Sequence, residues 1–271
     1  MKAITVFFYH PFRVALLRAA IVTAICLLAS AHAEAGEFGT RCQRSFQFGW
    51  QNTLPYMYDR CSGFNNELDD TDTKLFYYNL TGTGSGFTSN DGSVNAGGVD
   101  AVDLFYVSTH GGAQGDPINA TLTLWGIGQN ARSGDWRFGD NADGVRIFSQ
   151  YACETLWIDN NSYNRWDQVF KGGMQLATGS HDKVYDGWTT DETGEDYADD
   201  LQSGKSVKWA WFDGNSDWWS DQDVAIYASS SGSLGECQVR RDYMTWQNLS
   251  SFPRLRDNNM NRICASWISD N

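Results

Sequence analysis

The sequence predicts an α/β fold with a mostly parallel sheet flanked by helices, in a single secreted domain. Segments with strand character alternate with segments of helical character, which is the pattern that builds a parallel sheet. No internal repeat and no Pro-rich or Ser-rich linker divides residues 34–271. We therefore expect one domain after a signal segment, with its core at about residues 65–228.

The first 33 residues predict a cleavable signal peptide. Their only charged side chains are two arginines and a lysine, and an apolar run follows at residues 19–29. Ala-His-Ala at residues 31–33 then has the small residues that a signal peptidase recognises. The run is about half the roughly 20 residues that a membrane-spanning helix needs. We expect a secreted or periplasmic protein without membrane contact after cleavage, and an uncleaved anchor is the alternative.

Strands are expected where aromatic or β-branched residues form a short apolar run or alternate with polar ones. Such segments lie at residues 44–50, 102–108, 145–152, 174–178 and 223–228, the last of which is expected to close the sheet. Residues 121–138 predict a hairpin with a turn around Ser133-Gly134. Helices are expected at residues 70–80, where Asp70 or Thr71 is a candidate cap, and at 166–171, 195–202 and 206–212.

Composition excludes several classes of partner. The chain carries a net charge of −13, and loss of the basic signal segment would make it more acidic still. Nucleic acids and anionic membranes are negatively charged and bind proteins through Lys and Arg, so neither is an expected partner of this acidic chain. Aromatic residues make up 14% of the chain, enough for a substantial core, so disorder is not expected.

The cysteines indicate an oxidising compartment and one unpaired thiol. One of the six cysteines lies in the predicted signal, which leaves an odd number in the mature chain. Proximity favours the disulfides Cys42–Cys61 and Cys237–Cys264, although four cysteines allow three pairings. Cys153 would then keep a free thiol, which needs a reason in a secreted protein.

Two predicted strands end in reactive residues. The strand at 102–108 leads to His110-Gly111-Gly112, and the strand at 145–152 leads to Cys153. In a parallel sheet both ends lie at the carboxyl edge, where ligands of open α/β sheets bind. If the two strands are neighbours, the imidazole can favour the thiolate, which is the nucleophile. The N–H groups of the glycines and of Cys153 could then form an oxyanion hole.

The segments VDLFYVSTHGG (102–112) and VRIFSQYAC (145–153) resemble those of the caspase-like cysteine peptidases, the clan CD group of caspases, legumains, gingipains and clostripain. The spacing from His110 to Cys153 is in the range seen for caspases. The resemblance implies a caspase-like sheet, His110 as proton acceptor, Cys153 as nucleophile and the Gly111 N–H as oxyanion donor. The layout of residues 65–228 is also similar to a family of secreted bacterial domains of unknown function with the same His-Gly/Ala-Cys pattern.

Two further residues are candidates for substrate contact. Glu154 follows the cysteine where a caspase has Arg or Gln, and its carboxylate would raise the pKa of the thiol unless it points away or orients a substrate. His181 follows the predicted strand at 174–178. It could contact substrate, replace His110 as the partner of Cys153, or be an ordinary loop histidine.

Acidic clusters make calcium a candidate ligand. Residues 213–223 begin with Asp-x-Asn-x-Asp, like a calcium loop, but Trp218 stands where such a loop needs Gly, and the twelfth-position Glu is missing. Solvated acidic surface is the preferred interpretation of this segment and of residues 69–72 and 191–200. The histidines and the free cysteine are too scattered for zinc. We expect no required cofactor and no metal site, with calcium as the open option.

The sequence therefore predicts a secreted cysteine peptidase-like hydrolase that uses a His110–Cys153 dyad to cleave peptide bonds in a peptide or protein. The alternative is a non-catalytic secreted binding protein of caspase-like fold, for carbohydrate or calcium. Its sugar-stacking candidates are Trp209, Trp211, Trp218 and Trp219, although alternation places the first two in the core. Cys153 could also be a small buried apolar residue, or link two chains through a disulfide.

Overall fold

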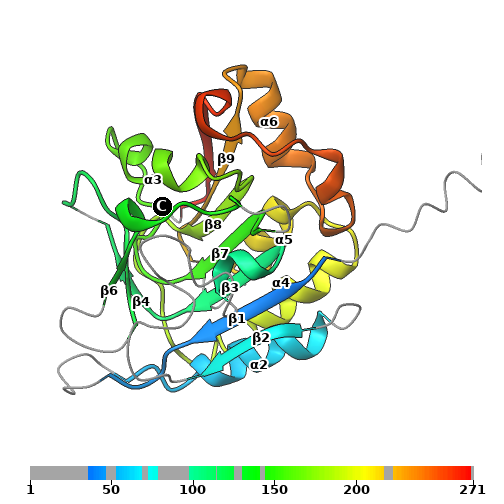
Figure 1. The fold of residues 1–271 in the computed structure, drawn as a ribbon. Coiled ribbons are helices and arrows are strands. Elements are labelled where there is room, and N and C mark those ends of the chain that lie inside the picture. Colours follow the sequence, from blue (N-terminus) through cyan, green and yellow to red (C-terminus); the bar gives the residue numbers. More distant parts are fainter. Residues whose placement is uncertain are drawn as a thin grey trace, which may run out of the picture. The chain divides into compact units, whose positions relative to one another are not determined.

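A seven-stranded, mostly parallel sheet forms the centre of the described part of the chain (Figure 1). The computed structural model describes residues 36–46, 53–68, 73–78, 98–113, 115–124, 130–140, 144–216 and 222–269, all within one compact unit, Ala35–Asn271. The predicted signal peptide, residues 1–33, lies outside the described residues. The described residues form one mixed α/β domain, as predicted.

The strands of this sheet are β1 (Phe38–Cys42), β2 (Thr73–Tyr78), β3 (Leu104–Ser108), β7 (Ile147–Tyr151), β8 (Leu176–Ser180), β9 (Val224–Ser230) and β10 (Arg262–Trp267). Their order across the sheet is β10-β9-β8-β7-β3-β1-β2. The five neighbouring strands β2, β1, β3, β7 and β8 pair in parallel, whereas β9 is antiparallel to both of its neighbours, β8 and β10. Every residue of β3 and of β7 is buried, because both faces of the sheet are covered.

Five α-helices are described: α2 (Met57–Glu67), α3 (Ser162–Phe170), α4 (Thr193–Gln202), α5 (Val207–Asp213) and α6 (Leu234–Tyr243). Short 3₁₀ turns lie at η2 (Val99–Ala101), η3 (Ser133–Asp135), η4 (Trp246–Ser251) and η5 (Asp257–Asn259). Within the described ranges, no helix is long and apolar enough to cross a membrane.

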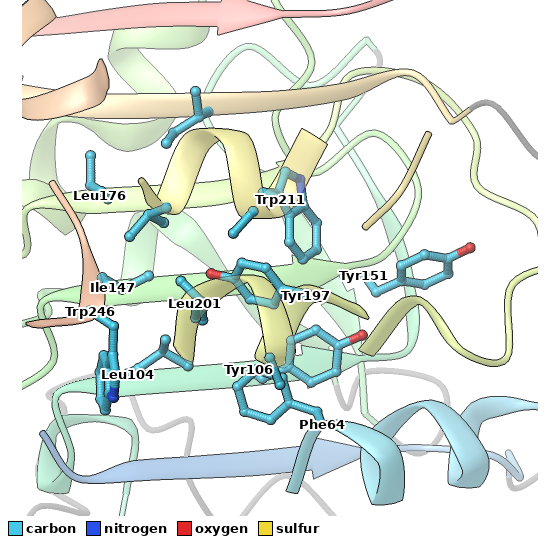
Figure 2. Packing of buried hydrophobic residues seen from close by; sticks show 14 of the residues in the cluster. Phe64, Leu104, Tyr106, Ile147, Tyr151, Leu176, Tyr197, Leu201, Trp211 and Trp246 are labelled. Atoms are coloured by element: carbon cyan, nitrogen blue, oxygen red, sulfur yellow. The ribbon is translucent and has the colours of Figure 1, made fainter. Parts of the chain in front are cut away.

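An aromatic core joins α2, α4 and α5 to one face of the sheet (Figure 2). Phe64 of α2 stacks on Tyr106 of β3 with ring centroids 4.7 Å apart. Tyr197 of α4 meets the edge of Trp211 of α5 at 5.0 Å. These large side chains are fully buried, so they fix the position of α2 over the strands that carry the candidate site.

The opposite face is covered by α3 and by a small antiparallel sheet of β4 (His110–Gly112), β5 (Thr121–Thr123) and β6 (Asn130–Arg132). Phe148 of β7 contacts Trp136, and Trp136 in turn contacts Trp166 of α3. Since β4 follows β3 after a single residue, this small sheet controls how the chain leaves the carboxyl end of β3.

Both predicted disulfides are present. Cys42–Cys61 connects the end of β1 to α2 with the Cα atoms 6.4 Å apart. Cys237–Cys264 connects α6 to β10 with the Cα atoms 6.0 Å apart. Cys153 is the free cysteine of the described residues, as expected from the odd count. The first disulfide ties α2 to the carboxyl edge of the sheet, beside the candidate site.

The predictions for the first strand and first helix were wrong. Among the described residues the first strand is β1, which precedes the predicted segment 44–50; residues 44–46 are not a strand, and residues 47–50 lie outside the described part of the chain. The predicted helix at 70–80 contains strand β2, because its short aromatic run (TKLFYY) has strand propensity and periodicity cannot separate a short strand from a helix. Helix α2 was not predicted at all.

Two details of the sheets also differ from prediction. The strand predicted at 223–228 exists as β9, but β10 pairs with it and forms the sheet edge. The hairpin within 121–138 is present as β5 and β6, yet Ser133-Gly134 belongs to η3 and is not the turn between them; residues 125–129, which connect the two strands, lie outside the described residues. The strands predicted at 102–108, 145–152 and 174–178 are confirmed within a few residues as β3, β7 and β8.

Candidate active site

The strands β3 and β7 are direct neighbours in the sheet, and their carboxyl ends lie at the same edge. Ser108 at the end of β3 is the register partner of Tyr151 at the end of β7. The pairing extends one step further, because the Thr109 N–H donates to Tyr151 O at 3.2 Å. The adjacency on which a His110–Cys153 dyad depends is therefore present.

A pocket of about 90 Å³ opens at this edge, and both His110 and Cys153 line it. Its walls come from four parts of the chain: the residues just after β3 and β7, helix α2 with the residues before it, and the loop after β8. The lining residues are Leu54, Met57, Arg60, Thr109, His110, Tyr151, Cys153, Val184, Tyr185 and Asp186.

His110 begins strand β4 and is half-buried. It pairs with Thr123 across β4 and β5, and the preceding Thr109 hydroxyl donates to the carbonyl of the same Thr123. Its ring lies 4.8 Å from the ring of Phe46, tilted by 39°. The imidazole is thus placed by a strand pairing and by an aromatic neighbour.

Cys153 follows the fully buried Ala152 and donates its thiol proton to Val184 O at 3.7 Å. Burial raises the pKa of this thiol, and the adjacent Glu154 carboxylate raises it further, as expected from the sequence, while Lys183 opposes the shift. In the described residues, the hydrogen-bond partner of the thiol is Val184, not the imidazole of His110. The described residues therefore do not show the expected imidazole contact that would stabilise a thiolate, and the raised pKa favours the protonated thiol.

Glu154 has a left-handed backbone conformation, with φ of 56°. This region costs a residue with a side chain of order 1–3 kcal/mol and is held only where the surroundings demand it. Here the Glu154 N–H donates to Asp182 O at 2.9 Å, and the Leu156 N–H donates to Ser180 O at 2.9 Å. The turn that carries Cys153 is therefore strained and fastened to the end of β8.

Gly111 lies against the Cys153 turn where only glycine fits. A Cβ at Gly111 would lie 2.7 Å from Cys153 O and 2.8 Å from Cγ2 of Thr155, closer than real Cβ atoms approach. A Cβ at Gly112 would have its nearest neighbour, Glu154 Oε2, at 4.0 Å, an ordinary contact. The steric reason for glycine thus applies to the first position alone, and it brings the β4 backbone up to the cysteine.

His181 lies outside the set of residues that line the pocket. Its ring stacks on Trp157 with centroids 5.0 Å apart, and its Nδ1 accepts the Ile158 N–H at 3.0 Å. The backbone N–H of His181 donates to Asp223 O at 2.7 Å. The structure therefore places His181 with the segment behind the cysteine turn and not beside the thiol.

Sequence reasoning missed the charged pair in the pocket, Arg60 and Asp186. Arg60 is fully buried, and its Nη1 lies 3.2 Å from Asp186 Oδ1. Arg60 directly precedes Cys61, so the predicted disulfide with Cys42 could have pointed to it. Asp186 had no comparable sequence marker, because it lies in a loop of mixed composition.

The residues described by the structure contain no group of three or more His, Cys, Asp or Glu side chains that could hold a metal ion. In the calcium-like segment, Asp213 binds Lys205 at 3.0 Å and Asn215 Nδ2 donates to Trp211 O at 2.8 Å. Residues 217–221 of this segment lie outside the described part of the chain, as do the acidic residues 69–72.

Comparison with known proteins identifies the family. The model of DUF6345, a domain of unknown function, matches residues 41–266. The chain belongs to this family. The match spans His110, Cys153 and both disulfides of this DUF6345 domain, and it carries no peptidase assignment. No curated protein matches the sequence.

Proposed function

We propose that this DUF6345 domain is a secreted cysteine-type hydrolase, caspase-like in its catalytic chemistry, that cleaves peptide bonds. The observation that carries the proposal is that His110 and Cys153, from neighbouring parallel strands, line one pocket. A nucleophile and a base that open into the same small cavity can both reach a substrate carbonyl placed there. The two disulfides are typical of proteins from oxidising compartments, which agrees with export.

The reaction would begin with transfer of the Cys153 proton to the His110 imidazole. The thiolate attacks the carbonyl carbon, and the His110 imidazolium then gives its proton to the amine as the C–N bond breaks. Water, deprotonated by His110, hydrolyses the resulting thioester and restores the thiol. The backbone N–H groups of Gly111, Gly112 and Cys153 are the proposed donors to the oxyanion, and no metal or cofactor takes part.

The raised pKa of the Cys153 thiol fits general-base catalysis better than a preformed thiolate–imidazolium pair. The bond from Cys153 to Val184 O exists only while the thiol keeps its proton. Substrate that fills the pocket would displace this contact, and the His110 imidazole would then accept the thiol proton. Catalytic hydrogen bonds of this kind commonly tighten only when substrate is bound.

Hydrolysis of a mixed fluorogenic peptide library by the disulfide-intact protein tests the proposal. Cys153→Ala and His110→Ala should each lower kcat/KM at least about 100-fold with unchanged melting temperature. His181→Asn is the matched control, because the amide oxygen can still accept the Ile158 N–H and His181 does not line the pocket. Wild-type turnover by Cys153→Ala would overturn the mechanism.

The runner-up is a non-catalytic binding protein, favoured by the raised pKa of the Cys153 thiol. Among its sugar-stacking candidates, Trp211 is in the core, but Trp209 is half exposed with Lys208 Nζ 4.7 Å from its ring, so the prediction that both are buried was wrong for Trp209. Trp218 and Trp219 lie outside the described residues. A binder predicts no loss of ligand affinity in Cys153→Ala, which separates it from the hydrolase.

A further inference from the structure

The lining of the pocket carries two opposite charges that neutralise each other. Arg60 Nη1 lies 3.2 Å from Asp186 Oδ1, and the second oxygen of Asp186 accepts the Tyr56 N–H at 3.4 Å. Both groups line the pocket, and both are nearly or fully buried. Neither offers an uncompensated charge to a ligand.

Each of the three nitrogens of the Arg60 guanidinium donates a hydrogen bond within the protein. Nε donates to Thr190 O at 2.8 Å, Nη2 to Thr190 Oγ1 at 2.8 Å, and Nη1 reaches Ser108 Oγ at 3.4 Å. The guanidinium lies 3.9 Å from the centre of the Tyr151 ring. A charged side chain that entered the pocket would lose its water and gain no opposite charge in return, which is strongly unfavourable.

The pocket is also small, and its wall is held in place. Its volume of about 90 Å³ is below the ~150 Å³ of a cavity that holds benzene. The loop that forms the wall is fastened at Tyr185, whose carbonyl accepts the Tyr151 hydroxyl at 2.6 Å and whose N–H donates to Gln222 Oε1 at 3.0 Å. Leu54, Met57 and Val184 give the rest of the lining an apolar character.

We infer that the pocket selects polypeptides with a small, uncharged side chain, of the size of Ala, Ser, Thr or Val, at the residue whose carbonyl meets Cys153. Asp186 is the specificity-determining residue, because it cancels the charge of Arg60. The inference rests on the proposed hydrolase function for its biological meaning. It makes a separate statement about the pocket, which can be tested on the thiol alone.

Methanethiosulfonate reagents of different charge and size provide the probe. The Cys153 thiol loses its proton to solvent and its sulfur attacks the sulfenyl sulfur of the reagent. The bond from that sulfur to the sulfonyl group breaks and methanesulfinate leaves, so turnover is not required. With rates normalised to free cysteine at one pH, the methyl reagent should modify the wild-type protein at least about tenfold faster than the sulfonatoethyl, trimethylammonioethyl or benzyl reagents. Equal normalised rates would overturn the inference.

Asp186→Asn should then reverse the selectivity against anions. Arg60 keeps its bonds to Thr190 and its stacking on Tyr151 but loses its counter-charge, so the anionic reagent should react about tenfold faster than with the wild type and the cationic one more slowly. Asp182→Asn removes the same charge from the same loop outside the pocket lining and should leave both rates unchanged. Equal effects of the two variants would contradict the assignment.

The two proposals fail in different ways. If no peptide is cleaved but the reagents show this selectivity, the pocket inference stands and the hydrolase proposal falls. If hydrolysis depends on Cys153 but peptides with charged or aromatic residues at the cleaved position are preferred, the inference alone is overturned. Should Asp186→Asn fail to fold, the wild-type series of reagents and peptides decides the question.

Discussion

Gly111 and Cys153 are so close that a Cβ on the glycine would lie 2.7 Å from the cysteine carbonyl oxygen. The β4 strand thus reaches the cysteine turn through a position without a side chain. Because His110 is the preceding residue, the same contact holds its backbone next to the cysteine turn. The close contact between these two backbone segments holds the two parts of the candidate site together.

Gly111→Ala should therefore destabilise the protein by about 1–3 kcal/mol and reduce Cys153-dependent activity in the fraction that remains folded. Gly112→Ala is the matched control, since its Cβ would meet only an ordinary contact at 4.0 Å and the change should stay within about 0.5 kcal/mol. Urea unfolding measures the free energy of unfolding of both variants. Equal losses in the two variants would show that the close approach is not a constraint.

The reactivity of Cys153 should depend on pH in a way set by its neighbours. Burial and the Glu154 carboxylate raise the pKa of the thiol, so iodoacetamide alkylation should be slow near neutral pH and keep rising beyond the range of an ordinary thiol. Glu154→Gln should shift the profile to lower pH, and Lys183→Gln should shift it to higher pH. Profiles that coincide with wild type in both variants would rule out these electrostatic causes.

Arg60 should contribute strongly to stability because it is fully buried and paired with Asp186. Arg60→Met leaves the carboxylate without its partner and is expected to cost about 3–5 kcal/mol in urea unfolding. The double variant Arg60→Met/Asp186→Asn removes the orphaned charge and should recover part of that loss. A cost below about 1 kcal/mol for the single change would mean that the ion pair is not structurally important.

Alkaline pH should destabilise the fold through buried tyrosines. Burial raises the pKa of Tyr227 to about 12, and its hydroxyl donates to Trp157 O at 3.2 Å. The unfolded chain releases this proton near pH 10 and the folded one does not, so stability falls by about 1.4 kcal/mol per pH unit between about pH 10 and 12 for this group. Tyr227→Phe should flatten that slope, whereas Tyr243→Phe, at an exposed position, should not.

The sequence was most informative where strands are buried on both faces. The runs LFYVS and IFSQY have no polar alternation, which is typical of central parallel strands, and their order along the chain made neighbouring positions plausible. From these two strands alone, His110 and Cys153 could be assigned to one edge. The local pairing of the four other cysteines was equally accessible, because sequence proximity favours short loops.

The two walls of the pocket that come from helix α2 and from the loop after β8 could not be predicted in this way. Helix α2 (MYDRCSGFNNE) has few apolar residues and buries an arginine, so periodicity does not reveal it. The partner of that arginine, Asp186, comes from a loop more than a hundred residues away, and only the folded chain brings the two together. The position of His181 depends on its stacking with Trp157, a tertiary contact that no local pattern encodes.

The Cys42–Cys61 disulfide also has a consequence for where in the cell the pocket is completed. It ties helix α2, and with it the neighbouring Arg60, to the end of β1. A covalent tie of this kind forms in oxidising compartments, and in a reducing one helix α2 would be held by non-covalent packing alone. We therefore expect the site to be complete only after this disulfide has formed.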